Sequence, residues 1–416
     1  MEKQKNIPQL RFTEFEGEWN HLILGDVCEK IQDGNYGGDY PKSTEFVDNG
    51  IPFLTSKAIG QDGILIDDKI DYITEEKHSQ LKKAHLKLHD ILFTNRGASV
   101  GAIGIVTEKV ANGNIGPQLT LLRCSNKIHC FFLKTIMVSP LVQKQIQSQN
   151  SGSAMNFFGI GDTSKFKLNI PTLPEQQKIA SFFTAIDQKI SQLKHKKTLM
   201  EQYKKGVMQK IFSQEIRFKK DDGQEFPKWE KKKLGDISDR ITTKNGEGNE
   251  TVLTISAQHG LVSQLDFFNK SVAADDLSGY YLLKKDDFAY NKSYSTGYPM
   301  GAFKRLKLYD KGVVSSLYIC FTFNSSANLS FMEQYFESGR HNREIEKVAQ
   351  EGARNHGLLN VGVGDFFSTE VLLPFLEEQT KIANFLSAID DKINHTQKQI
   401  EKAEVWKKGL MQQMFV

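Results

Sequence analysis

The sequence has 416 residues, of which 39% are hydrophobic and 25% are charged, with a formal net charge of +4 at pH 7. This length suits two or more domains, and the composition is ordinary for a soluble globular protein. No apolar run reaches the roughly 18 residues of a membrane span, and the N-terminus lacks the apolar core of a signal peptide. A cytoplasmic protein is therefore expected, and the small net charge does not by itself indicate a nucleic-acid partner.

The four cysteines do not form a pattern typical of a metal site. Cys28, Cys124, Cys130 and Cys320 are scattered and lack the paired spacing of zinc ligands. His129 stands beside Cys130, but this segment is better explained as an apolar strand followed by the start of a helix. No metal site is predicted, and free thiols fit a reducing compartment.

Residues 1–172 predict a first globular domain of mixed α and β structure. The apolar stretch at 51–60 predicts a strand that ends in a polar, glycine-terminated loop. Residues 88–106 predict two strands around a loop rich in Asn, Ser, Gly and a cation, and residues 112–124 predict buried strands. A helix is expected over 131–149. The loop glycines allow tight turns and the close approach of another backbone.

Residues 173–212 predict a long helix with a coiled-coil seam. Its apolar residues recur at alternating steps of four and three, which is the a/d spacing of a heptad repeat. The predicted apolar seam residues are Ile179, Phe183, Ile186, Ile190, Leu193, Met200, Val207 and Ile211. An amphipathic helix of this length cannot bury its apolar stripe alone, so it packs either on a neighbouring domain or, as we favour, on a second helix.

Residues 213–375 predict a second globular domain that is related to the first. Segments at 250–260, 284–303 and 311–321 resemble those at 51–60, 88–106 and 112–124, and a helix is expected over 330–350. The first domain begins with Arg11-Phe12, Trp19 and Leu24-Gly25-Asp26, and the second begins with Arg217-Phe218, Trp229 and Leu234-Gly235-Asp236. Similar ends around a divergent middle indicate one frame that carries two different binding surfaces.

Residues 376–416 predict a second long helix. The stretch from Glu378 to Phe415 aligns without a gap with the stretch from Glu175 to Phe212, at a constant offset of 203 residues. Its predicted apolar seam residues are Ile382, Leu386, Ile389, Ile393, Ile400, Leu410 and Met414. The predicted fold class is α+β, with a pseudo-two-fold internal repeat. Heptads alone do not separate parallel from antiparallel packing, but the order domain–helix–domain–helix favours an antiparallel coiled coil, which makes both units equivalent.

No motif in the sequence predicts catalysis by this chain. There is no phosphate-binding loop, and Gly97, Gly101 and Gly104 lie between predicted strands, unlike the glycines of a dinucleotide fold. The Asn-Pro-Pro-aromatic and Asp-Pro-Pro-aromatic tetrapeptides of amino-methyltransferases are missing. The carboxylate pairs at 275–276 and 286–287 are better explained as solvated turns than as a nuclease centre. No catalytic residue is predicted.

Polar loops at three matching places in each domain offer what base reading in the major groove needs. There, Arg or Lys binds guanine, Asn or Gln binds adenine, and Ser or Thr binds either. The candidate DNA-binding residues are Ser56, Lys57, Thr94, Asn95, Arg96, Ser99, Ser153 and Asn156 in the first domain, and Ser256, Gln258, His259, Asn291, Lys292, Ser293, Tyr294, Arg354, Asn355 and His356 in the second. Each loop alone also fits an ordinary surface, and the pattern does not say which base each residue reads.

The positive charge of the chain gathers on the first long helix. Residues 173–212 contain eight lysines and three acidic residues. The charge lies mostly in Lys194, Lys196, Lys197, Lys204, Lys205 and Lys210. This face is either simply solvated or close to phosphates, where lysine adds a salt-sensitive attraction that is independent of sequence.

The layout resembles the specificity (S) subunit of type I restriction–modification systems. The resemblance rests on the helix starts LPEQQKIASFF (173–183) and LPFLEEQTKIANFL (373–386), each followed by Ala-Ile-Asp (185–187 and 388–390) and a Lys-Lys-Gly motif (204–206 and 407–409). Pro8, Leu10, Arg11 and Phe12 with Trp19 also fit it. The resemblance covers essentially the whole chain, although its globular middles vary within the family.

The resemblance implies a DNA reader that is not itself an enzyme. Residues 1–172 and 213–375 are each expected to be a target recognition domain for one half of a bipartite, asymmetric sequence. The helices at 173–212 and 376–416, the family's two conserved regions, are expected to space the halves. The implied partners are two methyltransferase subunits, which use S-adenosylmethionine to methylate adenine N6, and two restriction subunits, which use ATP and Mg. No cofactor is expected in this chain, and the target adenine would flip into a partner.

Two other classes of protein remain open at this point. The first is a scaffold whose coiled coil is its function and whose domains bind proteins without DNA specificity. It is kept open by the nearly neutral globular domains, and the salt dependence of DNA binding separates it from a DNA reader. The second is an enzyme with an unrecognised active site, which methyl transfer by the isolated chain would reveal.

Overall fold

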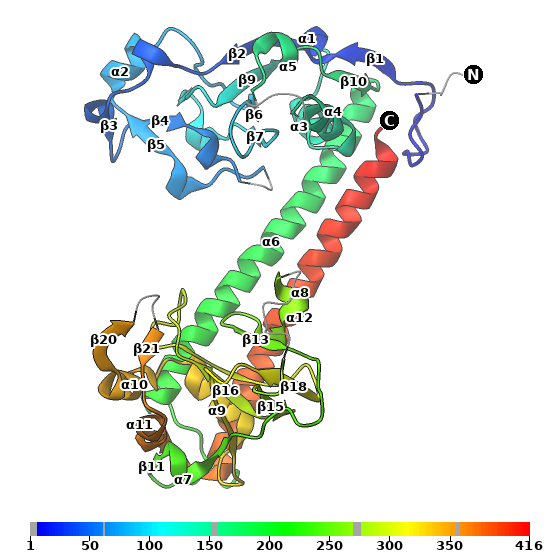
Figure 1. Cartoon of the computed structure of the whole chain (residues 1–416). Coiled ribbons are helices and arrows are strands. Elements are labelled where there is room, and N and C mark those ends of the chain that lie inside the picture. Colours follow the sequence, from blue (N-terminus) through cyan, green and yellow to red (C-terminus); the bar gives the residue numbers. More distant parts are fainter. Residues whose placement is uncertain (1–5, 61–62, 151–156, 269–275, 355–357) are drawn as a thin grey trace. The chain divides into compact units, whose positions relative to one another are not determined.

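The computed structural model describes residues 6–60, 63–150, 157–268, 276–354 and 358–416 (Figure 1). The chain divides into two compact units, each of which takes part of both long helices. Unit 1 consists of residues 1–194 and 398–416, and unit 2 consists of residues 195–397. This division differs from the predicted one, which places its boundaries at the ends of the helices. The predicted domain boundaries at 172 and 375 therefore stay a prediction.

Unit 1 combines ten strands with five short helices. The strands are β1 (Asn20–Ile23), β2 (Cys28–Asp33), β3 (Phe46–Val47), β4 (Ile51–Leu54), β5 (Asp71–Ile73), β6 (Ile91–Thr94), β7 (Ile103–Ile105), β8 (Asn114–Ile115), β9 (Leu119–Cys124) and β10 (Lys167–Ile170). The short helices are α1 (Leu24–Val27), α2 (Glu75–Gln80), α3 (Cys130–Met137), α4 (Pro140–Asn150) and α5 (Ile160–Thr163). These counts refer to the described residues.

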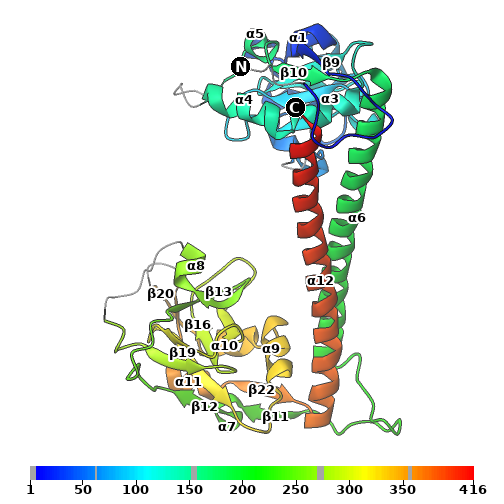
Figure 2. The same ribbon diagram turned by 90° about the vertical axis from the view of Figure 1, so that its right-hand side faces the viewer.

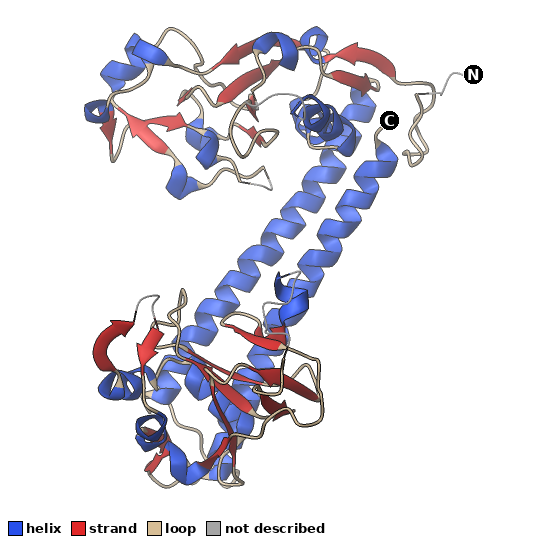
Figure 3. Ribbon diagram, viewed as in Figure 1, coloured by secondary structure: helices blue, strands red, loops and turns tan. Residues whose placement is uncertain are grey.

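Unit 2 repeats this mixture (Figure 3). Its strands are β11 (Glu230–Lys233), β12 (Ser238–Ile241), β13 (Leu253–Ser256), β14 (Gly260–Ser263), β15 (Tyr281–Lys284), β16 (Phe288–Asn291), β17 (Ala302–Arg305), β18 (Lys311–Val314), β19 (Ile319–Phe323), β20 (Gln350–Arg354), β21 (Leu358–Asn360) and β22 (Glu370–Leu373). Its short helices are α7 (Leu234–Ile237), α8 (Gln264–Phe268), α9 (Leu329–Glu337), α10 (Asn342–Val348) and α11 (Val363–Ser368).

The two units share the topology of their central sheet. In unit 1 the strand order is β2-β9-β6-β7, and in unit 2 it is β12-β19-β16-β17, with all neighbours antiparallel. A two-stranded antiparallel pair joins the first and last strands of each globular part, β1 with β10 and β11 with β22. The units differ elsewhere, since unit 1 adds the sheet β3-β5-β4-β8 and unit 2 adds the hairpins β13-β14 and β20-β21.

The central strands are buried on both faces. In β6, Ile91 and Phe93 belong to the core that faces the helices, whereas Leu92 belongs to a second core on the other face of the sheet. In β16, Phe288 and Ala289 divide between two cores in the same way. Because successive side chains of a strand point to opposite faces, a strand with a core on each side must be apolar throughout. This explains the continuous apolar runs in the sequence.

The helices predicted over 131–149 and 330–350 each exist as two helices, which corrects the prediction. Ser139 separates α3 from α4, and Pro140 begins α4, because proline is tolerated in the first helical turn but not in a helix interior. In unit 2, Gly339 follows α9 with a φ of 71°, a left-handed conformation that ends a helix.

Two long helices run through both units, α6 (Leu173–Phe212) and α12 (Leu376–Met414). Within each unit, part of α6 packs beside part of α12 in the antiparallel sense (Figure 2). In unit 1, Lys407 Nζ lies 2.6 Å from Asp187 Oδ1, and in unit 2, Lys204 Nζ lies 2.6 Å from Asp390 Oδ1. Adding 203 to the residue numbers maps Asp187 onto Asp390 and Lys204 onto Lys407. In each pair, the Asp of an Ala-Ile-Asp motif on one helix therefore bonds the first Lys of the Lys-Lys-Gly motif on the other helix.

Burial along the long helices is uneven. Among the predicted seam residues, the buried ones are Ile179, Phe183, Ile186, Ile190, Ile211, Ile382, Leu386, Ile389, Ile400 and Met414. The half-buried ones are Leu193, Met200, Val207, Ile393 and Leu410. Near the end of each helix the neighbouring residues Met208 and Met411 are buried instead of Val207 and Leu410. The reason is that a helix of 3.6 residues per turn drifts by about 20° per heptad, which over several heptads moves the buried face by almost one residue.

A buried carboxylate fixes each globular part to the start of its own long helix. Glu175 is 1% exposed and accepts hydrogen bonds from Arg11 Nε at 2.7 Å and from Trp19 Nε1 at 3.3 Å. Glu378 accepts from Arg217 Nη2 at 2.7 Å and from Trp229 Nε1 at 3.1 Å. We call each set of Glu, Arg and Trp a clasp. The clasps explain why Arg, Trp and Glu recur at matching places in the two halves of the sequence.

The next residue of each helix binds a loop of the same unit. In unit 1, Gln176 accepts a hydrogen bond from His129 N at 2.8 Å and donates to Lys127 O at 3.3 Å. In unit 2, Gln379 accepts from Asn328 N at 2.7 Å and donates to Ser326 O at 3.1 Å. The Glu-Gln pair therefore acts as a polar joint between a helix and its globular part.

The end of α12 completes the core of unit 1. Met411, Met414 and Phe415 are buried in the same core as Trp19, and the Phe415 ring packs edge-on against the Trp19 ring at 6.2 Å. The predicted α+β fold class, with two related units and an antiparallel pair of long helices, is confirmed. None of the helices in the described part of the chain combines the length and apolar character needed to span a bilayer.

Candidate nucleic-acid interface

The first candidate loop of unit 1 follows strand β4. Ser56 and Lys57 form a short 3-10 turn, η3 (Ser56–Ala58). Lys57 Nζ lies 2.8 Å from Asp71 Oδ2, and both side chains are partly exposed. The charge of Lys57 is therefore already balanced by a neighbouring strand, and a phosphate or base would compete with Asp71 for it.

The second candidate loop begins with two residues that are buried. Thr94 and Asn95 have no exposed surface. The Asn95 amide Nδ2 donates to Thr120 Oγ1 at 2.9 Å and to Asp33 Oδ1 at 3.3 Å, while its backbone bonds Gln118 O and Phe158 N. Both side chains are buried in this structure, and their role as base-contacting residues stays a prediction.

Arg96 follows Asn95 directly and is half-buried at the edge of this network. Its Nε donates to Asn95 Oδ1 at 3.2 Å, and its guanidinium carbon lies 4.4 Å from the centre of the Phe157 ring. A guanidinium stacked on an aromatic face is held in one plane. Gly97, Ala98 and Ser99 follow as an exposed tip, and Gly97 has a φ of 90°, which favours glycine.

The third candidate loop of unit 1 is only partly described. Ser153 and Asn156 lie outside the described residues. Phe157, which follows directly, is 48% exposed and pairs with Arg96 in an isolated antiparallel bridge. Arg96 and Phe157 therefore lie side by side, although they are about sixty residues apart in the sequence.

In unit 2 the first candidate loop is the tip of the hairpin β13-β14. Ser256 is buried, and its hydroxyl accepts a hydrogen bond from His259 N at 3.2 Å, so it shapes the turn instead of facing outward. Its role as a base-contacting residue stays a prediction. Gln258 and His259 are exposed at the tip. An exposed amide and imidazole on a tight hairpin can donate and accept hydrogen bonds to base edges.

The second candidate loop of unit 2 follows β16. Asn291 Oδ1 accepts a hydrogen bond from Ser293 N at 3.0 Å, and Lys292 O accepts one from Leu359 N at 3.0 Å. Tyr294 is 65% exposed. This loop contacts β21, the strand in which Leu359 lies. Arg354 is the last residue of β20, and its side chain is not described. Asn355 and His356 lie outside the described residues.

Sequence reasoning missed an aromatic–cation pair on unit 1. Tyr36 is 61% exposed, and Lys83 Nζ lies 4.0 Å from the centre of its ring. The preceding residue, Asn35, is buried and hydrogen-bonds Ile115 O through its backbone N at 2.8 Å. The segment 115–118 thus joins the Tyr36 loop to the loop of Arg96. Tyrosine scattered in a glycine-rich sequence gives no local signal for such a pair.

Most of the lysines predicted to lie near phosphates are engaged in ion pairs. Lys194 pairs with Glu404, Lys197 with Glu201, Lys204 with Asp390 and Lys210 with Glu215. Among the described residues no ion pair involves Lys196 or Lys205, and both are exposed. Part of the positive charge of α6 therefore stabilises the helix pair rather than standing free for a polyanion.

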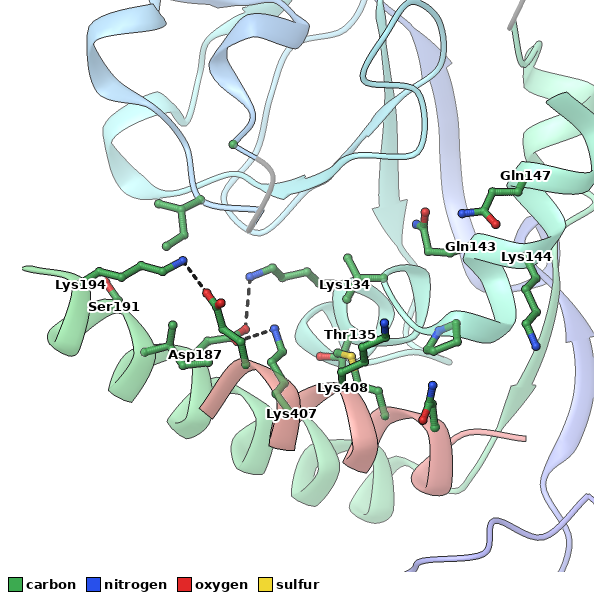
Figure 4. A pocket seen from close by; sticks show the side chains of 18 of the residues that line it. Lys134, Thr135, Gln143, Lys144, Gln147, Asp187, Ser191, Lys194, Lys407 and Lys408 are labelled. Atoms are coloured by element: carbon green, nitrogen blue, oxygen red, sulfur yellow. Dashed lines mark ion pairs between the residues drawn. The ribbon is translucent and has the colours of Figure 1, made fainter. Parts of the chain in front are cut away.

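A cleft of about 1050 Å³ within unit 1 retains a positive excess (Figure 4). It lies between α3, α4 and the two long helices, and its charged lining residues are Lys134, Lys144, Asp187, Lys194, Glu404, Lys407 and Lys408. Lys407 and Lys134 both approach Asp187, at 2.6 and 3.9 Å. Lys144 and Lys408 have no ion pair among the described residues, which makes this cleft suited to an anion.

The cysteines of unit 1 come together without forming a metal site. Cys28 and Cys124 are opposite each other in the β2-β9 pair, and Cys130 begins α3 nearby. A hydrogen bond with Cys124 lowers the pKa of the Cys130 thiol to about 7. Within the described residues, no group of three or more His, Cys, Asp or Glu side chains has the arrangement of a metal site.

The two units share the topology of the central sheet, a clasp and a helix joint, but they differ in their polar loops. The family model of the type I restriction modification DNA specificity domain matches residues 16–202 and again residues 227–405. The chain belongs to this family. Both matches include a globular part and much of the following long helix.

Curated relatives carry the same description. The type I restriction enzyme MjaVIII specificity subunit of Methanocaldococcus jannaschii is 24% identical over 431 aligned residues, which cover 98% of this chain and 95% of that protein. The MjaX specificity subunit of the same organism is 28% identical over 243 residues. That match covers 56% of each protein, so the chain spans little more than half the length of this relative.

Solved structures show the same fold. The S subunit of a type I restriction-modification system from M. genitalium superposes with a TM-score of 0.57 at 12% identity, covering 99% of both chains. A chain from a study of complex assembly and conformational transition of the type I R-M system gives a TM-score of 0.55 at 14% identity, covering 94% of this chain and 96% of that one. At these identities the likeness concerns the fold alone.

Proposed function

We propose that this chain is the DNA-recognition subunit of a type I restriction–modification complex and that it reads a bipartite, asymmetric target. The observation that carries the proposal is a duplicated frame with unequal loops. The clasp, the central sheet and the helix joint recur in both units, whereas the polar loops at the ends of the matching strands differ in residues and in conformation. A frame of this kind suits two different half-sequences, one for each globular part.

The loops supply chemistry for both tasks of DNA binding. Arg96 in unit 1 and Gln258 and His259 in unit 2 are donors or acceptors suited to base edges. Lys144 and Lys408 in the cleft of unit 1 are suited to phosphates, which position a protein on the duplex without reading sequence. Both kinds of contact support a sequence-specific reader over a protein-binding scaffold.

The long helices are proposed to set the distance between the half-sites. A helix of 40 residues, such as α6, is about 60 Å long at 1.5 Å per residue. Antiparallel packing, with the ion pairs Asp187–Lys407 and Asp390–Lys204 fixing the register, makes the helix pair a stiff spacer. At 3.4 Å per base pair, half-sites centred somewhat more than one helical turn apart are within the reach of such a spacer.

The chemistry is assigned to partner subunits. Two methyltransferase subunits would bind S-adenosylmethionine and methylate adenine N6 in the target, and two restriction subunits would use ATP and Mg for cleavage. The target adenine would be extruded from the duplex into a methyltransferase subunit. The chain itself would bind no cofactor and catalyse no step, and the complex would act on DNA in the cytoplasm.

The test is a methylation map. The full chain is co-expressed with its methyltransferase partner in a host that lacks the system, and N6-methyladenine is located across the host genome. We expect one motif made of two short sequences around a fixed gap. If an active partner methylates no defined motif in the presence of this chain, the recognition function is wrong and a scaffold role is favoured.

A further inference from the structure

The loop after β6 in unit 1 presents one arginine in a fixed orientation. Arg96 uses its Nε as a donor to Asn95 Oδ1 at 3.2 Å and stacks on Phe157 with 4.4 Å between the guanidinium carbon and the ring centre. Across the described ranges, no acceptor is recorded for its two terminal nitrogens. They are coplanar N–H donors, and the two N–H bonds on the edge of the guanidinium opposite Nε are parallel, so they can meet two neighbouring acceptors together.

The support for this arginine is a hydrogen-bonded network in which Asn95 and Thr120 are buried and Asp33 is half-buried. Thr120 Oγ1 donates to Asp33 Oδ1 at 2.7 Å and accepts from Asn95 Nδ2 at 2.9 Å. Thr120 and Asn95 have no exposed surface. Breaking such a network strands buried polar groups, so the network holds Asn95 in one orientation and leaves its Oδ1 free for Arg96. Asn95, which does not reach the surface, is thus a positioning residue.

The matching loop of unit 2 lacks this arrangement. Tyr290-Asn291-Lys292 correspond to Thr94-Asn95-Arg96 in sequence, but Asn291 Oδ1 accepts a hydrogen bond from Ser293 N, not from the cation that follows. No hydrogen bond or ion pair of the Lys292 side chain is recorded among the described residues, and an ammonium on a flexible stem is a point charge without a plane. Only unit 1 presents a cation with a fixed plane at this position.

We propose that Arg96 determines the specificity of unit 1 by reading one guanine in the major groove. Two coplanar donors match the O6 and N7 acceptors of guanine, which no other base presents together. A phosphate can also accept two hydrogen bonds from an arginine, but such a contact would depend on salt and not on the N7 atom of a guanine. This proposal rests on the proposed function, because it names a base within one half of the target.

The experiment uses the complete complex of this chain with its methyltransferase partner on synthetic duplexes. The wild-type target comes from the methylation map, and each guanine of both half-sites is replaced in turn by 7-deazaguanine, which lacks the N7 acceptor. The quantity measured is kcat/KM for adenine methylation. For the wild-type complex we expect one guanine, in one half-site, whose replacement lowers kcat/KM roughly 5- to 150-fold.

Three variants separate reading from support. Arg96→Ala should lower kcat/KM on the natural target by a similar factor and abolish the further loss at that one guanine. Arg96→Lys should keep the charge but not recover full discrimination. Lys292→Ala is the matched control in unit 2, and it should leave the sensitivity of this guanine unchanged.

Three results would overturn the proposal. The first is a target whose two half-sites contain no guanine, and the second is an Arg96→Ala complex that is still sensitive to every 7-deazaguanine. The third is an Arg96→Ala complex that loses kcat/KM equally on all duplexes and whose salt slope is reduced by about one unit, which indicates a phosphate contact. If the wild-type complex shows no sequence-specific methylation, the proposed function fails instead, so the two failures are distinguishable.

Discussion

The clasps and the recognition loops follow opposite rules within the same two units. Glu175 and Glu378 bind their Arg and Trp partners in almost the same way, although the two globular parts share little sequence between these landmarks. The loops after β6 and β16 begin with the same Asn-cation pair and then diverge. Arg96 stacks on Phe157, whereas the Lys292 side chain has no hydrogen bond or ion pair within the described part of the chain. Each clasp ties a globular part to the start of its own long helix, whereas the loops after β6 and β16 differ between the two units.

This difference indicates where sequence change is tolerated. Replacing a buried carboxylate that accepts hydrogen bonds from a guanidinium and an indole N–H leaves the positive charge of the arginine buried and unpaired. A loop at the end of a central strand needs only to keep its backbone bonds to the neighbouring segment, such as Phe158 N to Asn95 O and Leu359 N to Lys292 O.

The largest expected effect comes from breaking a clasp. Glu175→Gln and Glu378→Gln each remove the charge that compensates a largely buried arginine, and each should lower the free energy of unfolding of its own unit by about 3–5 kcal/mol. Hydrogen–deuterium exchange read peptide by peptide assigns the loss to unit 1 or unit 2. Glu14→Gln, which breaks an exposed ion pair with Lys178, is the control and should leave the free energy of unfolding almost unchanged. Similar losses for all three variants would contradict the role of the clasps.

A smaller effect should distinguish the units by pH. His341 in unit 2 is 1% exposed, its Nε2 lies 3.1 Å from Thr369 Oγ1, and burial lowers its pKa to about 3. Above pH 6.5 the imidazole is neutral in both the folded and unfolded states, so it makes no difference. Below pH 6.5 His341 binds a proton in the unfolded chain but stays neutral in the folded one. The free energy of unfolding of unit 2 therefore falls from pH 6.5 down to about pH 3.

Between pH 7 and pH 4.5 this histidine should cost unit 2 about 3 kcal/mol. His341→Gln, which cannot titrate, should remove that part of the pH dependence whatever it does to stability at pH 7. The comparison of urea unfolding of the two proteins at both pH values isolates the effect from carboxylates that titrate in the same range. Parallel pH profiles for the wild type and the variant would show that His341 is not the cause.

The smallest expected effect concerns the two helix ion pairs. Exchanging the charges in unit 2, Asp390→Lys with Lys204→Asp, should recover most of the roughly 1 kcal/mol lost in either single variant, because the neighbouring Gln334 is neutral and can turn its amide oxygen to the new lysine. The same exchange in unit 1, Asp187→Lys with Lys407→Asp, places a lysine beside Lys134 and should recover less. Equal recovery in the two units, measured by chemical unfolding, would remove this distinction.

The parts of the fold that repeat in sequence were the most predictable. The heptads and the ungapped match from Glu175 to Phe212 predict both long helices, because a periodic apolar stripe is a local signal. The register of the pair was not predictable in the same way, since the bond between Asp187 and Lys407 joins residues on different helices. Pro140 is a local signal that the helix predicted over 131–149 is interrupted, because proline disrupts a helix interior.

The candidate site was predictable only as a set of loops. The strand before Asn95 is apolar on both faces, and sequence alone does not say whether the residue after it turns outward or inward. Burial settles this for Thr94, Asn95 and Ser256, which belong to the interior. The contact of Arg96 with Phe157 and the hydrogen bond between Arg11 and Glu175 join distant parts of the chain. Secondary-structure propensity and hydrophobic periodicity are local properties, so they do not predict such contacts.

The claim that the helix pair spaces two half-sites has a direct test. One heptad of helix-forming residues is inserted into α6 after Lys194 and another into α12 after Gln397, where the two units divide, so that both ion pairs stay in register. Seven residues add about 10 Å, or about three base pairs of DNA.

The methylation map of this variant with its methyltransferase partner should show the two half-sequences of the wild type around a longer gap. Half-sequences that change, or a gap that stays the same, would contradict the account.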